Sequence, residues 1–195
     1  MVACNPRKLS GNWVSGFALD IHTVSSKHLG LNEAGHDVFD TKRSELGELL
    51  YRLKFKGDKT AAQAIIDTVV EILKPSRKKF DLIVPVPPSG KRPIQPVITL
   101  ANGFGAALDL PVIECVTTTR STTQLKGVIG AEKRNELLAG LHAVDAKHTA
   151  GKNILLFDDL YRSGATLNAI TGLLMQKGKA ASVRVLTITH TRSHQ

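Results

Sequence analysis

The chain has 195 residues, a formal net charge of +9 at pH 7, 42% hydrophobic residues and two cysteines. This length and composition predict one globular domain that can bury a sizeable hydrophobic core without disulfide or metal cross-links. Cys4 and Cys115 lie far apart and outside any C-x-x-C pattern, and the histidines show no metal-ligand spacing. A disulfide framework and a structural zinc site are therefore not expected.

The basic balance favours polyanionic partners such as nucleotides or nucleic acid, although a solvated basic surface would explain it equally well. No apolar run approaches the length of a membrane span, and residues 1–16 lack the continuous apolar segment of a signal peptide. We therefore expect a protein of the reducing cytoplasm with no membrane contact.

Hydrophobic patterning predicts strands that alternate with helices. In chain order, the predicted elements are a strand at residues 17–24 with a hairpin completed at 36–39, helices at 41–56 and 61–73, a strand at 82–86, a helix at 94–108, strands at 111–116, 141–144 and 153–157, a helix at 166–176 and a strand at 183–189. Thr41 or Ser44 is suited to cap the first helix. Strands separated by helices form βαβ units, so the expected class is α/β with a parallel-centred sheet and ligands beyond the carboxyl ends of its strands.

The most informative segment, residues 154–166, reads ILLFDDLYRSGAT. It predicts a buried strand that ends in two adjacent carboxylates, Asp158 and Asp159, followed by a tight turn and a helix. Carboxylates at a strand end can accept hydrogen bonds from sugar hydroxyls, directly or through Mg²⁺. Neighbouring side chains on an extended segment point to opposite faces, so one could serve the sugar and the other a water or a metal. A solvated turn with a helix-capping aspartate is the alternative for such a pair taken alone.

The turn after the carboxylates is suited to bind a phosphate. Backbone N–H groups and hydroxyls at a helix start attract anions, and Gly164 permits a close backbone approach. A plain helix start capped by Ser163 is compatible with that role. The candidate phosphate-binding residues are Arg162, Ser163, Gly164, Ala165 and Thr166. A carboxylate pair followed by an anion-binding turn predicts a site for 5-phosphoribosyl-1-pyrophosphate (PRPP).

This segment resembles the PRPP-binding motif of type I phosphoribosyltransferases, and more of the chain resembles their ComF-like branch, which is linked to natural competence. The supporting pieces follow the family's order: LYRLKFKGD at residues 50–58, VPVPPS at 84–89, RPIQP at 92–96 and TRSTTQLK at 119–126. The resemblance implies a type I phosphoribosyltransferase fold, with a small N-terminal hood over residues 1–45 and a phosphoribosyltransferase core over residues 46–195. Many ComF-like proteins carry an N-terminal zinc ribbon, and the cysteines of this chain do not provide one.

The resemblance also implies the remaining parts of the site. Asp158 and Asp159 would be the catalytic carboxylates and would hold Mg²⁺, directly or indirectly. The implied pyrophosphate loop is Pro88, Ser89, Gly90 and Lys91, for which a proline-rich connection with surface basic residues is the alternative. Residues 117–135 would form a flexible loop that closes over PRPP, with Arg120, Thr123, Gln124, Lys126 and Arg134 as candidates, and a solvated loop is the alternative.

Arg162 departs from the pattern of purine-salvage relatives, which often place an aspartate here to assist deprotonation of the base. Arginine cannot act as that base, which argues against ordinary hypoxanthine–guanine salvage. Its side chain either strengthens phosphate binding or points outward.

The implied activity is transfer of the 5-phosphoribosyl group from Mg²⁺–PRPP to a nitrogen acceptor, with release of pyrophosphate. Two alternatives stay open on the same fold: a competence protein that binds single-stranded nucleic acid, and a PRPP sensor without turnover. Two basic clusters, Lys54 and Lys56 with Arg52, and residues 77–79, are expected to be solvated faces. Weak binding of single-stranded nucleic acid and a homodimer also stay open.

Overall fold

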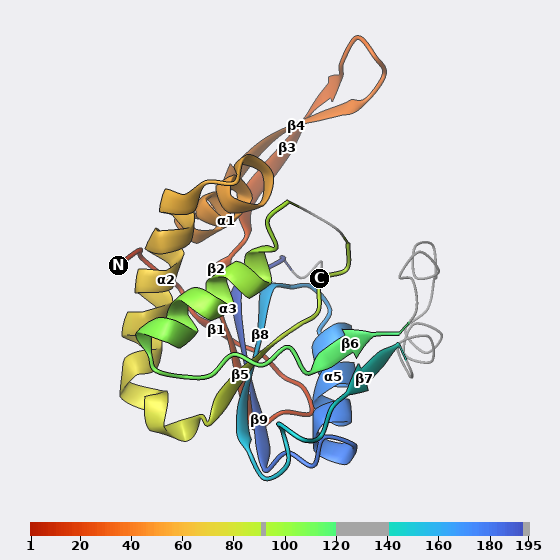
Figure 1. The fold of residues 1–195 in the computed structure, drawn as a ribbon. Helices are drawn as coiled ribbons and strands as arrows, with labels where there is room; N and C mark the ends of the chain where they lie inside the picture. The colour runs from red at the N-terminus through yellow and green to blue at the C-terminus, as the bar shows by residue number, and fades with distance from the viewer. Residues whose placement is uncertain (91–92, 120–140, 193–195) are drawn as a thin grey trace.

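A five-stranded sheet lies at the centre of the molecule, a computed structural model that describes residues 1–90, 93–119 and 141–192 (Figure 1). In spatial order the strands are β1 (Arg7–Lys8), β2 (Ser15–Ile21), β9 (Ser182–His190), β8 (Asn153–Tyr161) and β5 (Leu82–Pro85). The last four pair in parallel, whereas β1 pairs antiparallel with β2. The predicted α/β class with a mostly parallel sheet is confirmed.

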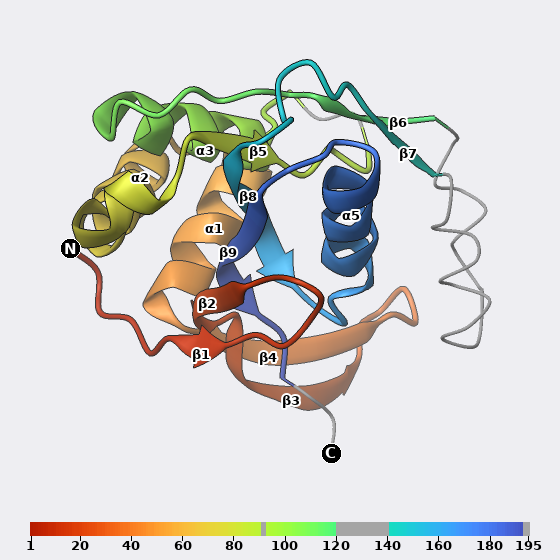
Figure 2. The same cartoon turned by 90° about the horizontal axis from the view of Figure 1, so that it is seen from below.

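Helices cover both faces of this sheet (Figure 2). On one face lie α1 (Glu45–Lys56), α2 (Lys59–Leu73) and α3 (Pro96–Ala107), with the 3₁₀ helix η1 (Lys74–Lys79) after α2, and on the other face lies α5 (Ala165–Gln176). The side chains of β8 alternate between the two layers, as the period of a strand requires. Leu155 and Phe157 join the core beneath α1–α3, and Ile154 and Leu156 join the core beneath α5.

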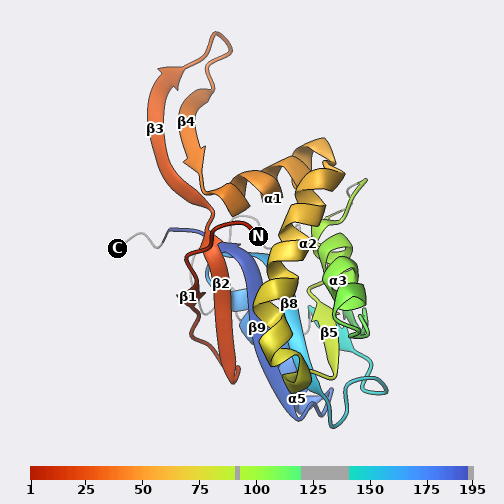
Figure 3. The same ribbon diagram turned by 90° about the vertical axis from the view of Figure 1, so that its left-hand side faces the viewer.

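Two hairpins lie outside the central sheet. The strands β3 (Thr23–Leu31) and β4 (Asp37–Arg43) pair antiparallel and protrude from the body (Figure 3). The strands β6 (Val116–Thr118) and β7 (His142–Val144) form the second antiparallel pair. The predicted strand at 17–24 is divided at His22 between β2 and β3. The His22 N–H donates to the carbonyl of His190 at 2.8 Å, and the pairing with β9 stops there because β9 ends at His190.

Several predicted boundaries differ from the observed ones. Of the predicted strand at 111–116, Val112 forms a single bridge with Ile83, since Pro111 has no N–H to extend the ladder, and Val116 is the first residue of β6. Strand β8 runs to Tyr161, four residues beyond the predicted end at Phe157, because its pairing with β9 continues through both aspartates.

The proposed division at residue 45 stays a prediction. Two strands of its N-terminal part, β1 and β2, are hydrogen-bonded into the central sheet, and β3–β4 is the part that protrudes. Across residues 1–90, 93–119 and 141–192, no helix is both long and apolar enough to cross a bilayer.

Candidate functional site

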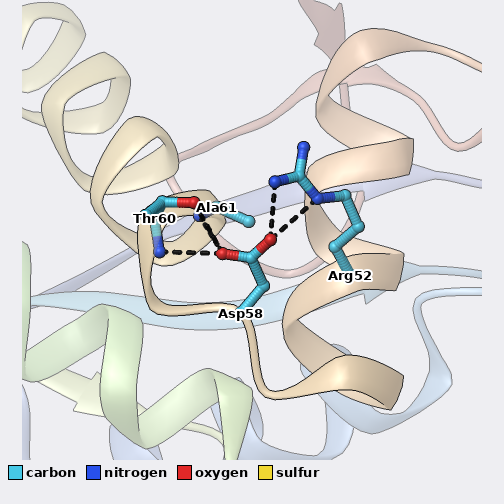
Figure 4. Close-up of polar contacts among 4 residues, drawn as sticks. All are labelled: Arg52, Asp58, Thr60 and Ala61. Atoms are coloured by element: carbon cyan, nitrogen blue, oxygen red, sulfur yellow. Dashed lines mark hydrogen bonds and ion pairs between the residues drawn. The ribbon is translucent and has the colours of Figure 1, made fainter.

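The corner between α1 and α2 is held by a network around Asp58 (Figure 4). Helix α1 ends at Gly57, whose φ of 64° is left-handed. Asp58 then caps α2, accepting from the N–H groups of Thr60 and Ala61 at 2.9 and 3.0 Å, and from Nε and Nη2 of Arg52 at 2.9 and 2.5 Å. Hydrogen bonds from Thr60, Ala61 and Arg52 hold the pKa of Asp58 well below its ordinary value. The last turn of α1 is thereby fixed over the sheet.

The fixed turn carries Lys54 into the centre of the site. Its Nζ lies 2.8 Å from Oδ2 of Asp159, and the two side chains are only 17% and 13% exposed. Lys54 follows the fully buried Leu50 by four residues, so both lie on the inner face of α1. Asp159 follows Phe157 by two residues on β8 and shares its side of the sheet. The prediction that Lys54 belongs to a solvated basic face is wrong, because helical periodicity directs it toward the sheet.

Asp158 points to the opposite side of β8, the side that carries α5. It lies two residues after Leu156, which packs beneath that helix. Its Oδ1 accepts from the N–H of Asp159 at 2.8 Å. Burial, and then the negative charge of Asp159, raise the pKa of Asp158 to about 7. The two adjacent carboxylates therefore have different environments: Asp159 forms an ion pair with Lys54, whereas burial and the charge of its neighbour raise the pKa of Asp158.

The turn after β8 presents backbone N–H groups. Helix α5 begins after Gly164, which has a φ of 74°, and no described side chain caps it, so the alternative of a helix start capped by Ser163 does not hold. A Cβ at Gly164 would lie 2.8 Å from Oη of Tyr161, so glycine is required for space as well as for conformation. The N–H groups of Ala165 and Thr166 consequently have no side-chain cap, which leaves them suited to an anion.

A second wall faces this turn. Residues 87–90 follow β5, and Nε2 of Gln95 donates to the carbonyl of Gly90 at 3.0 Å and holds the loop. Between the walls lies a cleft of about 660 Å³. It is lined by Lys54, Val86, Pro87, Pro88, Ser89, Gly90, Gln95, Pro96, Val97, Thr118, Leu141, His142, Asp158, Asp159, Leu160, Tyr161, Arg162, Ser163, Gly164, Ala165, Thr166, Leu167 and Thr191.

The fold brings most of the predicted site residues to this one cleft. Both aspartates, the whole segment 162–166 and residues 88–90 line it, and Arg162 is exposed at its edge. The other predicted positions lie outside the described residues: Lys91, Arg120, Thr123, Gln124, Lys126 and Arg134.

Sequence reasoning missed several residues of the cleft. Besides Lys54, the structure adds Gln95, Tyr161, His142 and Thr191. Burial lowers the pKa of His142, which keeps its ring neutral at pH 7. The one sequence signal that Lys54 faces the interior is its position on the apolar stripe of α1, four residues after Leu50. His142 is the first residue of β7 and Thr191 follows the last residue of β9, so the two lie far apart in the sequence, and no motif marks them.

The carboxylate oxygens that line the cleft are compatible with Mg²⁺ that enters bound to a phosphorylated ligand. The described residues hold no group of three or more histidine, cysteine or acidic side chains able to form a metal cage. Mg²⁺ keeps several waters and binds through one or two carboxylates plus substrate phosphates, rather than in an all-protein cage. Asp158 and Asp159, which line the cleft, are carboxylates of this kind.

Comparison with known proteins finds a relative in sequence and several solved structures with a similar fold. No family model matches the chain. The competence protein ComFC of Bacillus subtilis (strain 168) is 32% identical over 151 residues, which cover 76% of this chain and 61% of ComFC. The glutamine PRPP amidotransferase from B. subtilis, solved with ADP and GMP, superposes with a TM-score of 0.51 at 16% identity, over 80% of this chain and 34% of that one. A structure of the allosteric regulatory enzyme of purine biosynthesis matches with the same TM-score, identity and coverage.

The chain is ComF-like, with the type I phosphoribosyltransferase fold. This confirms the resemblance drawn from residues 50–58 and 154–166. The ComF-like chain spans about 61% of the length of ComFC, so the activity of the whole relative does not transfer with the fold.

Proposed function

We propose that the cleft binds PRPP together with Mg²⁺ and transfers its 5-phosphoribosyl group to a nitrogen acceptor, releasing pyrophosphate. One observation supports this above the others. Two adjacent carboxylates and an uncapped helix N-terminus form one wall of a cleft of about 660 Å³, opposite the loop of residues 87–90. Sites of this size hold ligands of the size of a sugar bisphosphate.

In this proposal each wall takes one part of PRPP. The N–H groups of residues 164–166 donate to the 5-phosphate, and the α5 dipole adds to their attraction. Asp158 and Asp159 accept hydrogen bonds from the ribose hydroxyls. Residues 88–90 receive the pyrophosphate; Lys91, the fourth predicted residue of this loop, lies outside the described residues. When bound, Mg²⁺ supplies positive charge that stabilises the pyrophosphate leaving group.

The transfer then requires little covalent chemistry from the protein. The bond between C1 of the ribose and the pyrophosphate oxygen breaks, and its electron pair leaves with pyrophosphate. The lone pair of the acceptor nitrogen forms the new bond to C1, and the proton of that nitrogen passes to solvent. The chain contributes position and charge complementarity, with Asp158 and Asp159 next to the cationic sugar. Arg162 cannot take the acceptor proton, so an acceptor that needs a base at this position is disfavoured.

The nucleic-acid alternative has less support, although the relative is named a competence protein. Three of the six residues in the two basic clusters are used inside the fold, and the other three are exposed. Arg52 binds Asp58, Lys54 lies in the cleft, and Arg77 donates to the carbonyl of Leu108 at 2.9 Å. In its favour, the side chain of Phe55 is 64% exposed and could stack on a base.

Calorimetry tests the proposal. Mg²⁺–PRPP should bind the wild-type chain with micromolar to low-millimolar affinity. Losing hydrogen bonds to charged groups costs about 1.5–3 kcal/mol each, so Asp158→Asn/Asp159→Asn should weaken binding at least about tenfold. Asp67→Asn/Glu71→Gln, which also removes two carboxylate charges but from the exposed face of α2, is the matched control. Affinity equal to the wild type in the double variant would contradict the proposal.

Two further assays separate the alternatives. Pyrophosphate release on a panel of nitrogen bases distinguishes an enzyme from a sensor, which would bind PRPP without turnover. A titration with single-stranded DNA at several salt concentrations tests the nucleic-acid alternative, because binding through phosphates weakens steeply with salt. Tight DNA binding without PRPP binding would favour the competence role over the enzyme.

A further inference from the structure

A cation lies inside the cleft, and the PRPP-binding motif does not account for it. Lys54 comes from α1, far in sequence from residues 158–166, yet its ammonium is 2.8 Å from Asp159. We propose that Lys54 is a pyrophosphate-binding residue that changes partners, holding Asp159 while the cleft is empty and turning to the pyrophosphate of PRPP when the substrate enters. This inference rests on the proposed function.

The backbone around Lys54 is fixed, and its side chain can turn. The hydrogen bonds between Arg52 and Asp58, and the left-handed Gly57, hold the end of α1. The lysine stem has four rotatable bonds, and its ammonium has three donors, of which Asp159 uses one. Lys54 lines the same cleft as the loop of residues 87–90. A change of partner therefore needs rotation of one side chain and no movement of the helix.

Charge gives the reason for the exchange. The described residues that line the cleft include two acids, Asp158 and Asp159, and two long basic side chains, Lys54 and Arg162. In the empty cleft, Lys54 compensates the nearly buried carboxylate of Asp159. A buried carboxylate that loses its cationic partner is strongly destabilised. Lys54 can therefore leave Asp159 only if another group takes its place. The ribose hydroxyls and Mg²⁺ of the substrate provide that replacement, and the pyrophosphate provides the new partner of the ammonium.

Comparing three ligands on the full chain tests the exchange. Calorimetry should be run with Mg²⁺–PRPP, Mg²⁺–pyrophosphate and ribose 5-phosphate on the wild type, Lys54→Met, Lys54→Arg and Lys56→Met. Lys54→Met keeps the length of the stem, and Lys56→Met removes an exposed lysine two residues away as the matched control. We expect Lys54→Met to weaken PRPP and pyrophosphate about tenfold or more, and ribose 5-phosphate by less than about threefold. Lys54→Arg should retain most of the affinity, and Lys56→Met all of it.

Removing Lys54 alone also leaves Asp159 unpaired, so a thermal melt should accompany each titration. If Lys54→Met does not fold, Lys54→Met/Asp159→Asn removes both charges and is compared with Asp159→Asn alone. A further loss of pyrophosphate affinity in the double variant supports the exchange, and equal affinity overturns it. Unchanged PRPP affinity in Lys54→Met, or an equal loss for ribose 5-phosphate, also overturns it while the proposed function stands. A wild-type chain that binds none of the three ligands removes the proposed function and this inference with it.

Discussion

Gly164→Ala tests the geometry of the turn that starts α5. The φ of Gly164 is 74°, and a left-handed conformation costs a non-glycine residue about 1–2 kcal/mol. The new Cβ would also lie 2.8 Å from Oη and 2.9 Å from Cε2 of Tyr161, so the aromatic ring must move. Overpacking of this kind costs about 1–3 kcal/mol. The two effects together predict a loss of about 2–5 kcal/mol in the free energy of unfolding.

Gly151→Ala separates the two contributions. Gly151 has a φ of 70°, and no atom lies within 4 Å of the position that a Cβ would take there, so alanine bears the backbone cost alone. In a chain of this size, 1 kcal/mol changes the Tm by about 2–4 °C. Thermal unfolding should therefore show a larger decrease for Gly164→Ala than for Gly151→Ala. Equal decreases would refute the steric contact with Tyr161, and an unchanged Tm in Gly164→Ala would refute the turn geometry.

Two further predictions concern the framework of the site. Asp58→Asn should destabilise the chain at pH 7, and the difference from the wild type should shrink in acid. The pKa of Asp58 is lowered in the folded state, so its stabilisation is complete above its ordinary value of 3.8 and is lost as the pH falls toward the folded value. Urea unfolding between pH 7 and 2 checks this, and a constant difference would contradict it. Phe104→Ala should cost about 3–5 kcal/mol in a urea titration, because Phe104 is fully buried edge-on against Phe157 at 4.9 Å between ring centroids, and a loss below about 1 kcal/mol would show that the core repacks.

The framework of the fold was predictable because its signals are local. The apolar strand at 153–157, the leucine spacing of α1 and the glycine at its end each specify one element. The alternation of strands and helices then implies a parallel sheet whose strand ends meet in one place. The prediction that Asp158 and Asp159 point to opposite faces follows from strand geometry alone, and the structure agrees with it through Lys54 on one side and the α5 layer on the other.

The parts that sequence reasoning missed depend on contacts between distant segments. Strand β8 continues through the aspartates only because β9 runs beside it as far as His190. Serine is a common helix-capping residue, so the sequence allows Ser163 as the cap of α5. In the structure the left-handed Gly164 is the N-cap residue, because the chain turns sharply after Tyr161. The basic neighbours of Lys54 favour a solvated face in the sequence. Its partner Asp159 lies more than a hundred residues away, and no local pattern predicts that pair.

A crystal structure of the wild-type chain with Mg²⁺–PRPP tests the central claim most directly. The account predicts the 5-phosphate on the N–H groups of residues 164–166, the ribose hydroxyls at Asp158 and Asp159, and the pyrophosphate at residues 88–90, with the ammonium of Lys54 turned toward it. PRPP bound elsewhere on the surface, with the turn before α5 empty, would contradict the account.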